Sequence, residues 1–539
     1  MVLYNKNKIP LGLDIETGET VFVSMDTIDR HLLFVGKSGS GKSYLARQLM
    51  FKLAKHRLCI LFDPNTHLAM DMLDDVIVSP KLRKSSLFLS FTDPDSVPLM
   101  DFMQGSLSET SRDRERRKYL AGMFTTSLIT TAGPGGSTAG AAFVRFKMNS
   151  ELGVRLLLEL RQPIALLPHL FKFQSRILQA LLPRTKDTEI RDHFANLLNI
   201  GNSNQYYQLV ESTVTRLNQF FNSVVLESMF SVNGGGILIA DLIRRRNGIV
   251  ICDFGVTETR TVEHSRLIQK LLLDAIKRIA MNRTDAEAHR YPVSVCLDEA
   301  TSSGLLDMAD AEALQATRKF GIHQCFLVQG TAGMKNRQPG VNLVEAVLEN
   351  TAGKLIFGMA SDVDAIRFAK LGIAGMDFRT AKMVKETERQ KLLGYETYSR
   401  TTISTGSDGK KSVSVTPVDR PILSTEIEVN ETLYTADELF YKEAGQLLSF
   451  DTGQFRYFGP EYPSGVDLYT PAPKFLPSAI KKRNDRRRQE FIQNQLDQFP
   501  YRDIDGIRRD FQDILNRHGL PNDLSASDAA VSDPENPFD

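Results

Sequence analysis

The chain has 539 residues, 42% of them hydrophobic and 24% charged, and its 66 basic and 65 acidic side chains leave a formal net charge of +1. A chain of this length exceeds what one hydrophobic core organises, so several domains are expected. A net charge near zero excludes an overall field that attracts nucleic acid or anionic lipid, so any basic surface is local. The sequence contains no run near the roughly eighteen apolar residues that a membrane-spanning helix needs.

The polar stretch 1–20 lacks the apolar core of a signal peptide, and we expect a cytoplasmic protein that reaches the inner face of a membrane only through partners. Four cysteines each fall in a different strand-like apolar run, namely Cys59, Cys252, Cys296 and Cys325. This distribution predicts small core residues in a reducing compartment, and neither a disulfide framework nor a zinc site.

Short apolar runs rich in β-branched residues recur along the chain at 32–36, 57–62, 86–91, 248–254, 292–297, 322–328 and 353–358. Several are continuously apolar, which is typical of parallel strands covered on both faces. Between two of these runs, residues 262–283 carry Leu267, Leu271, Ala275 and Ile279 at four-residue spacing, which predicts an amphipathic helix. Strands alternating with helices predict an α/β fold with a mostly parallel, doubly wound sheet.

The alternation stops between residues 106 and 245, where helical spacing dominates. We therefore expect a discontinuous α/β domain, 1–105 with 246–470, that carries a mostly helical insertion, 106–245. A glycine-rich loop is expected at 131–140 and a flexible hairpin or linker at 398–421. The remainder, 471–539, is expected to be a basic helical segment followed by an acidic, disordered tail.

The octapeptide "GKSGSGKS" matches the full P-loop pattern, in which glycines let successive backbone N–H groups point at nucleotide phosphates. Lys42 would reach the β- and γ-phosphates, and the hydroxyl of Ser43 would bind Mg²⁺. A chance match is disfavoured because a strand-like run precedes the loop and a helix-like run follows it. The predicted nucleotide-binding residues are Gly36, Lys37, Ser38, Gly39, Ser40, Gly41, Lys42, Ser43 and Tyr44.

An acidic pair, Asp298 and Glu299, ends the strand-like run "VSVCL". Asp298 would hold Mg²⁺, and Glu299 would polarise the attacking water, which favours hydrolysis over phosphate transfer to another substrate. Asp253 also ends a strand-like run, but it lacks a second carboxylate and is predicted to belong to a core strand.

Two further residues are candidates for roles in hydrolysis. Gln329 ends the next strand-like run and would sense the γ-phosphate or position water, although a plain strand-end glutamine is the alternative. Arg318, before that run, would reach the nucleotide of a neighbouring subunit as an arginine finger, with a solvated basic face as the alternative.

Taken in order, these motifs resemble the HerA/FtsK superfamily of P-loop ATPases, and most closely the TraD/TraG-type coupling ATPases of conjugation and type IV secretion. The likeness extends to a histidine before the P-loop strand, His31, to Asp63-Pro64 at the end of the second strand, and to Asn350. It implies a RecA-like core that hydrolyses ATP with Mg²⁺, a homohexameric ring, and DNA in a central channel. Typical coupling proteins also carry N-terminal transmembrane helices, which this sequence lacks.

The cargo and the DNA contacts are left open by the sequence. The leading hypothesis is a DNA translocase that works with a relaxase or a secretion channel. A HerA-like ring that organises a nuclease in repair or defence, and a protein-secretion ATPase, are the alternatives. The basic runs 112–120 and 481–491 are candidate DNA contacts, although both would also suit solvated helix faces. Sequence-specific readout is not expected, because no zinc-finger or helix-turn-helix pattern is present.

Overall fold

The computed structural model describes residues 8–92, 97–101, 111–131, 141–231, 236–256, 261–301, 305–306, 308–334, 343–373, 382–405, 409, 411–433, 436–471, 478–498, 501–502 and 504–518. The chain divides into two compact units, residues 1–364 with 447–539, and residues 365–446. Among the described residues, no helix is both long and apolar enough to cross a membrane.

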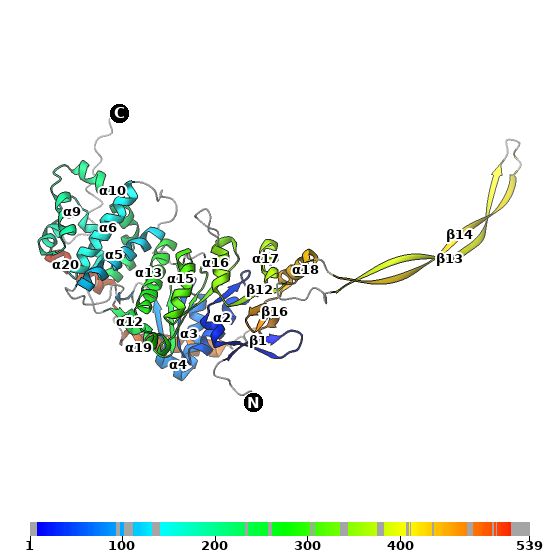
Figure 1. Ribbon diagram of the computed structural model, residues 1–539, viewed down its shortest axis with the longest axis horizontal. Coiled ribbons are helices and arrows are strands. Elements are labelled where there is room, and N and C mark those ends of the chain that lie inside the picture. Colours follow the sequence, from blue (N-terminus) through cyan, green and yellow to red (C-terminus); the bar gives the residue numbers. More distant parts are fainter. Residues whose placement is uncertain are drawn as a thin grey trace. The chain divides into compact units, whose positions relative to one another are not determined.

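An eleven-stranded sheet forms the centre of the first unit (Figure 1). Its strands are β1 (Lys8–Asp14), β2 (Thr20–Ser24), β3 (Leu32–Val35), β4 (Leu58–Asp63), β5 (Leu87–Ser90), β9 (Gly248–Asp253), β10 (Val293–Leu297), β11 (Ile322–Val328), β12 (Gly353–Phe357), β15 (Gln454–Gly459) and β16 (Tyr462–Tyr469). Their order across the sheet is β2-β1-β16-β15-β12-β3-β11-β10-β4-β9-β5. The seven strands from β12 to β5 are parallel, and the remaining four extend the sheet with antiparallel pairing.

The parallel strands are buried because helices cover both faces of the sheet. Every residue of β3, β4, β9 and β10 is buried, as their continuously apolar sequences predict. One group of neighbouring helices consists of α2 (Lys42–Leu53), α3 (His67–Val78) and α4 (Pro80–Ser85). A second group comes later in the chain and consists of α13 (Val262–Met281), α14 (Asp285–Arg290), α15 (Met308–Lys319) and α16 (Leu343–Asn350). The predicted α/β fold with a mostly parallel sheet is confirmed.

The segment predicted as a helical insertion is mostly helical in the structure. Its helices are α5 (Ser111–Thr131), α6 (Ala141–Glu159), α7 (Leu167–Leu170), α8 (Arg176–Leu181), α9 (Thr188–Leu198), α10 (Ser203–Phe221), α11 (Val224–Phe230) and α12 (Ile239–Ile243). Phe124, Phe171, Phe194 and Tyr206 are among its largest buried side chains. Residue 131 ends α5, and the rest of the predicted glycine-rich loop lies outside the described residues.

The basic run 481–491 belongs to α19 (Ser478–Leu496), which packs against α3 and β5. Arg488 forms a bidentate ion pair with Asp74 of α3, and Phe491 is buried in the sheet's core. Gln495 accepts a hydrogen bond from the backbone N–H of Phe88 at 3.0 Å. Part of this run therefore holds α19 on the sheet. After it, α20 (Ile504–Arg517) packs on α11, and the predicted acidic tail from residue 519 lies outside the described residues.

The second unit contains the longest strands of the described chain. Antiparallel strands β13 (Lys382–Thr405) and β14 (Lys411–Leu433) form a separate two-stranded sheet, flanked in sequence by α17 (Asp362–Ile373) and α18 (Ala436–Ser449) (Figure 1). Of the stretch 398–421, predicted as a flexible hairpin or linker, residues 398–405 and 411–421 belong to the two strands of this long hairpin.

Candidate nucleotide-binding site

The predicted motif residues gather at one edge of the sheet. The P-loop follows β3, Asp298 follows β10 and Gln329 follows β11, and these three strands are parallel, with β11 lying between the other two. The carboxyl ends of parallel strands meet at the same edge, which is where α/β proteins bind their ligands. Residues separated by almost 300 positions in sequence are therefore neighbours.

The P-loop backbone requires glycine at three positions. Gly39 and Gly41 have φ angles of 75° and 102°, in the left-handed region that favours glycine, and Gly36 has a φ of 156°. A Cβ atom added to Gly36 would lie 2.6 Å from the Cβ of Phe357 on β12. The loop is thus packed tightly against the neighbouring strand, and α2 starts at Lys42 directly after it.

Two segments that sequence reasoning missed hold the P-loop in place. The backbone N–H of Lys37 donates to the carbonyl of Gly358 at 2.8 Å. On the loop's other side, the N–H of Gly453 donates to the carbonyl of Ser40 at 3.0 Å, and the Thr452 hydroxyl donates to the carbonyl of Gly39 at 3.2 Å. The only sequence signal for the second segment is the turn-forming "DTG" before β15.

Lys42 is buried beneath the loop, where its Nζ donates to the carbonyls of Gly36 at 2.6 Å and Lys37 at 2.8 Å. Burial lowers the pKa of Lys42, and the nearby carboxylates of Asp298 and Glu299 act in the opposite direction. The Ser40 hydroxyl is buried in the same loop and has no hydrogen-bond partner among the described residues. The cradle thus presents a cation and an unsatisfied hydroxyl, which suits a phosphate ligand.

The acidic pair and the glutamine form one cluster. Asp298 is buried and accepts a hydrogen bond from the N–H of Glu299 at 3.1 Å. Glu299 has a φ of 47°, an uncommon left-handed conformation for a non-glycine residue. Gln329 donates through Nε2 to Oε1 of Glu299 at 3.2 Å, so the structure brings Lys42, Asp298, Glu299 and Gln329 together.

Asp63, at the end of β4, adds a second buried carboxylate next to Asp298. Its two carboxylate oxygens accept hydrogen bonds from the N–H groups of Asn65 at 2.8 Å and Ala69 at 2.7 Å, at the start of α3. Burial, followed by the charge of Asp63, raises the pKa of Asp298 to about 7. Asp253 ends β9 and accepts hydrogen bonds from the hydroxyls of Thr66 and Thr92, consistent with its predicted place in a core strand.

Arg318 does not belong to this cluster. It lies near the end of α15, before β11, whereas Gln329 follows β11, and seven residues of strand span about 20 Å. Its side chain is 47% exposed and forms a 3.8 Å ion pair with Asp26. The arginine-finger role expected from the sequence concerns a neighbouring subunit, so it stays a prediction.

Residues 239–426 match the family model described as type IV secretory system conjugative DNA transfer. The resemblance to the conjugative coupling ATPases is confirmed. No curated protein matches the chain.

Solved structures of a coupling protein share the fold. The bacterial conjugative coupling protein TrwBdeltaN70, in a trigonal form in complex with sulphate, is 14% identical over 87% of this chain and 91% of that chain, with a TM-score of 0.51. TrwB in complex with ADP and Mg²⁺ is 14% identical over 88% and 92%, with a TM-score of 0.51. TrwB in complex with the ATP analogue ADPNP is 14% identical over 84% and 88%, with a TM-score of 0.50. At this identity, the likeness shows a common fold.

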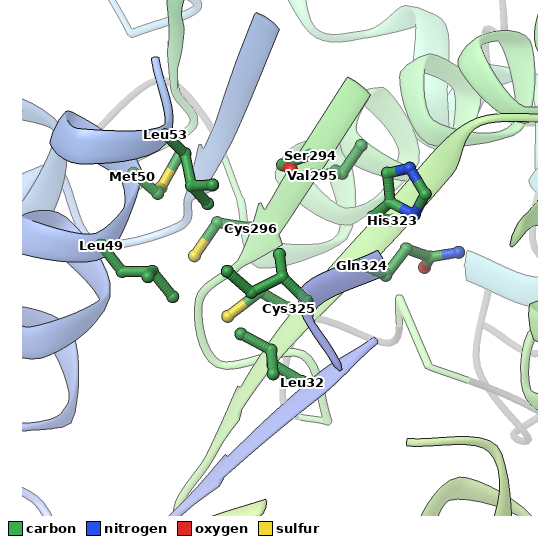
Figure 2. Close-up of a pocket in the computed structure, with 11 residues that line it drawn as sticks. Leu32, Leu49, Met50, Leu53, Ser294, Val295, Cys296, His323, Gln324 and Cys325 are labelled. Atoms are coloured by element: carbon green, nitrogen blue, oxygen red, sulfur yellow. The ribbon is translucent and has the colours of Figure 1, made fainter. Parts of the chain in front are cut away.

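A small apolar cavity lies under α2, the helix that follows the P-loop (Figure 2). Leu49, Met50 and Leu53 of α2 line it from one side, and Cys296 and Cys325 of neighbouring strands β10 and β11 line it from the other. Its volume of about 20 Å³ accommodates one water molecule, so it is not the nucleotide site. The cysteines predicted as core residues pack at the sheet, with Cys59, Cys252 and Cys296 buried and Cys325 partly buried.

The histidine of the coupling-ATPase resemblance, His31, ties the start of β3 to its neighbours. Its Nδ1 accepts from the N–H of Gln324 at 2.9 Å, and its Nε2 lies 2.9 Å from the carbonyl of Leu314, to which it donates in the neutral tautomer. Burial lowers the pKa of His31 to about 4, and the charges of His323, Arg318 and Lys277 act in the same direction.

We expect acid to destabilise the protein partly through His31. Because the folded pKa of about 4 lies below the unfolded value of about 6.5, the unfolded chain binds a proton that the folded chain excludes. The resulting stability is complete above pH 6.5 and falls by about 2 kcal/mol by pH 5. Urea unfolding at pH 7.5 and pH 5 would show a smaller loss in His31→Asn, which is less stable at pH 7.5. The exposed His56→Asn serves as control, and equal losses in the wild type and His31→Asn would contradict this assignment.

Proposed function

We propose that this protein is an ATP-hydrolysing DNA translocase of the coupling type, which forms a ring and moves DNA, or a DNA–protein substrate, in conjugative transfer or type IV secretion. The observation that carries the proposal is the gathering of a P-loop, the Asp298–Glu299 pair and Gln329 at one sheet edge. The match of residues 239–426 to the conjugative DNA transfer family supports it.

ATP and Mg²⁺ are the proposed cofactors. TrwB, which has the same fold, was solved with ADP and Mg²⁺ and with an ATP analogue, which supports this choice. The backbone N–H groups from Gly36 to Ser43 would hold the phosphates, and Lys42 would exchange its two carbonyl acceptors for phosphate oxygens. Mg²⁺ would be held by Ser43 and Asp298, and it supplies positive charge that stabilises the phosphate oxygens during hydrolysis.

Glu299 is the proposed residue that orients and polarises the attacking water. The hydrogen bond from Gln329 fixes its carboxylate, so Gln329 would link the state of the γ-phosphate to the position of Glu299. Arg318, exposed at the opposite end of β11, would stabilise the transition-state charge in the site of a neighbouring subunit.

The proposed assembly is a homohexamer with DNA in its central channel, bound through phosphates without sequence readout. A relaxase, a secretion-channel component or a nuclease would be the protein partner, and the protein would work in the cytoplasm, at the membrane only through such partners. Since Arg488 and Phe491 hold α19 on the sheet, the run 481–491 offers fewer groups to DNA than its sequence implies.

We expect DNA to stimulate ATP turnover. The test measures hydrolysis without DNA, with single-stranded DNA and with duplex DNA, in a preparation whose mass is measured in parallel. Stimulation should weaken steeply with salt, because phosphate contacts release counterions. An assembled ring whose turnover neither form of DNA changes would instead indicate a protein-secretion ATPase.

A further inference from the structure

The β13–β14 hairpin, called the ribbon below, is a two-stranded sheet that pairs with no other strand of the described chain. Its register is continuous from Lys382↔Leu433 to Thr405↔Lys411, with one irregularity near Gly394. At about 3.4 Å per residue, the ribbon extends for about 75 Å. An isolated two-stranded hairpin is at best marginally stable in water, so a ribbon of this length needs a covering surface.

In the outer half of the ribbon, most of the apolar side chains lie on one face. Residues directly opposite each other share a face, and successive residues alternate between faces. One face carries Ile403 opposite Val413, Thr401 opposite Val415, and Tyr395 opposite Pro421. The side chains of Tyr395, Ile403, Val413 and Val415 are each more than 60% exposed. This set, with Pro417 and Pro421, is called the apolar face. One polar pair interrupts it, in which the Thr397 hydroxyl donates to the carboxylate of Asp419 at 2.6 Å.

The other face is polar at the tip and carries Tyr398 opposite Val418 farther toward the base. Ser404 and Ser412 lie opposite each other with their hydroxyls 2.8 Å apart, and Thr402 lies opposite Ser414. Nearer the base, Glu396 lies opposite Arg420. The tip of the ribbon is thus amphipathic, a pattern that natural sequences use where one side of a strand pair is buried.

The prolines indicate which part of the ribbon makes the contact. A proline fits into a ladder only where its missing N–H points outward, so the outer edge of β14 lacks donors at Pro417 and Pro421. Another strand pairing along that edge would lose two hydrogen bonds. Packing through the apolar face costs nothing of this kind.

The net charge of the outer ribbon is too small to attract a polyanion to the apolar face. Residues 393–424 contain four basic side chains, Arg400, Lys410, Lys411 and Arg420, and three acidic ones, Glu396, Asp408 and Asp419, which leaves a net charge of +1. The face itself is aliphatic and aromatic, so a protein surface of the same character fits it.

We propose that the apolar face of the ribbon packs against the same face of neighbouring copies of this chain, so that the ribbon is an assembly arm. The apolar face occupies the outer half of the ribbon and offers on the order of 350 Å², less than half of the roughly 800 Å² per partner of stable interfaces, so it would add to contacts that the copies make elsewhere. Identical copies supply an apolar face of matching length and spacing. This proposal depends on the proposed ring only in one respect, the number of copies whose ribbons meet.

The test compares two double variants of the full-length chain that differ only in the face they alter. Val413→Asp with Val415→Asp changes the apolar face, and Ser412→Asp with Ser414→Asp places the same charges on the polar face of the same strand. Mass is measured by sedimentation velocity across protein concentrations, and nucleotide binding confirms that the first unit is folded. We expect the valine variant to need about tenfold or more protein to assemble, and the serine variant to assemble like the wild type.

Cross-linking tests the contact between ribbons independently of the proposed ring. Val415→Cys should be joined between copies by a short bis-maleimide, whereas Ser414→Cys should not. Wild-type assembly by the valine variant, or no cross-link at position 415, would overturn the assembly arm. A membrane is the other possible occupant, and flotation with phosphatidylethanolamine–phosphatidylglycerol vesicles tests for it. If the valine variant still assembles but no longer floats with the vesicles, the face binds a membrane and the assembly arm is overturned. Unstimulated ATP turnover with DNA would overturn only the translocase.

Discussion

Replacing Glu299 by glutamine is expected to lower ATP turnover by about 10²- to 10⁴-fold while nucleotide binding persists. Glutamine has the size of glutamate, and its amide oxygen can still accept the hydrogen bond that Gln329 donates to Oε1. The positions of Lys42 and Asp298 should therefore be preserved. The change removes the carboxylate that would take up a proton from the attacking water, so it should act on the chemical step.

The measurement is steady-state ATP hydrolysis beside equilibrium binding of a fluorescent ATP analogue. Glu345→Gln is a matched control, because Glu345 is an exposed carboxylate on α16. Glu299→Gln should retain affinity within a few-fold and lose turnover, whereas Glu345→Gln should retain both. Normal turnover in Glu299→Gln would show that another group activates the water and that the assignment of the acidic pair is wrong.

The parallel half of the sheet was predictable because each strand signals itself locally. A continuous apolar run such as "CILF" needs cover on both faces wherever it lies, and all of β3, β4, β9 and β10 proved buried. The antiparallel extension gave no such signal. β1 pairs with β16 through Leu13↔Tyr469, and this contact joins segments more than 450 residues apart whose sequences are short and mixed.

The features of the site also divide into those that the sequence predicts and those that it does not. P-loop chemistry depends on residue types at fixed spacing, so Lys42, Ser43, Asp298 and Glu299 could be named from the sequence. The hydrogen bond between Gln329 and Glu299 was not readable, although both residues were, because it depends on the order of the strands. The support from Thr452 and Gly453 was missed because a short turn bonded to another loop's backbone leaves little composition signal.

The ribbon shows a different limit. Its Ser- and Thr-rich outer half is predicted from composition as a flexible hairpin or linker, yet apolar residues alternate along β14 at Val413, Val415 and Pro417. A period-two pattern predicts a strand with one buried face. Composition and periodicity disagreed, and the structure follows periodicity.

Replacing Lys42 by alanine is expected to reduce ATP turnover by about 100-fold or more, and unlike Glu299→Gln it should also weaken nucleotide binding. The Lys42 ammonium is the buried cation of the cradle, and its hydrogen bonds to the carbonyls of Gly36 and Lys37 link the first turn of α2 to the start of the loop. Alanine removes both the charge that faces the phosphates and this link.

Lys37→Ala separates the site-specific effect from a general loss of positive charge, because Lys37 is exposed in the same loop and its backbone N–H bond to Gly358 does not need the side chain. We expect Lys37→Ala to keep most of the turnover and Lys42→Ala to keep almost none, measured by hydrolysis and by binding of a fluorescent ATP analogue. Equal effects of the two variants would mean that the loop attracts nucleotide only through its overall charge. A large difference would instead require a cation at one fixed point, which is the position that burial beneath the loop gives to Lys42.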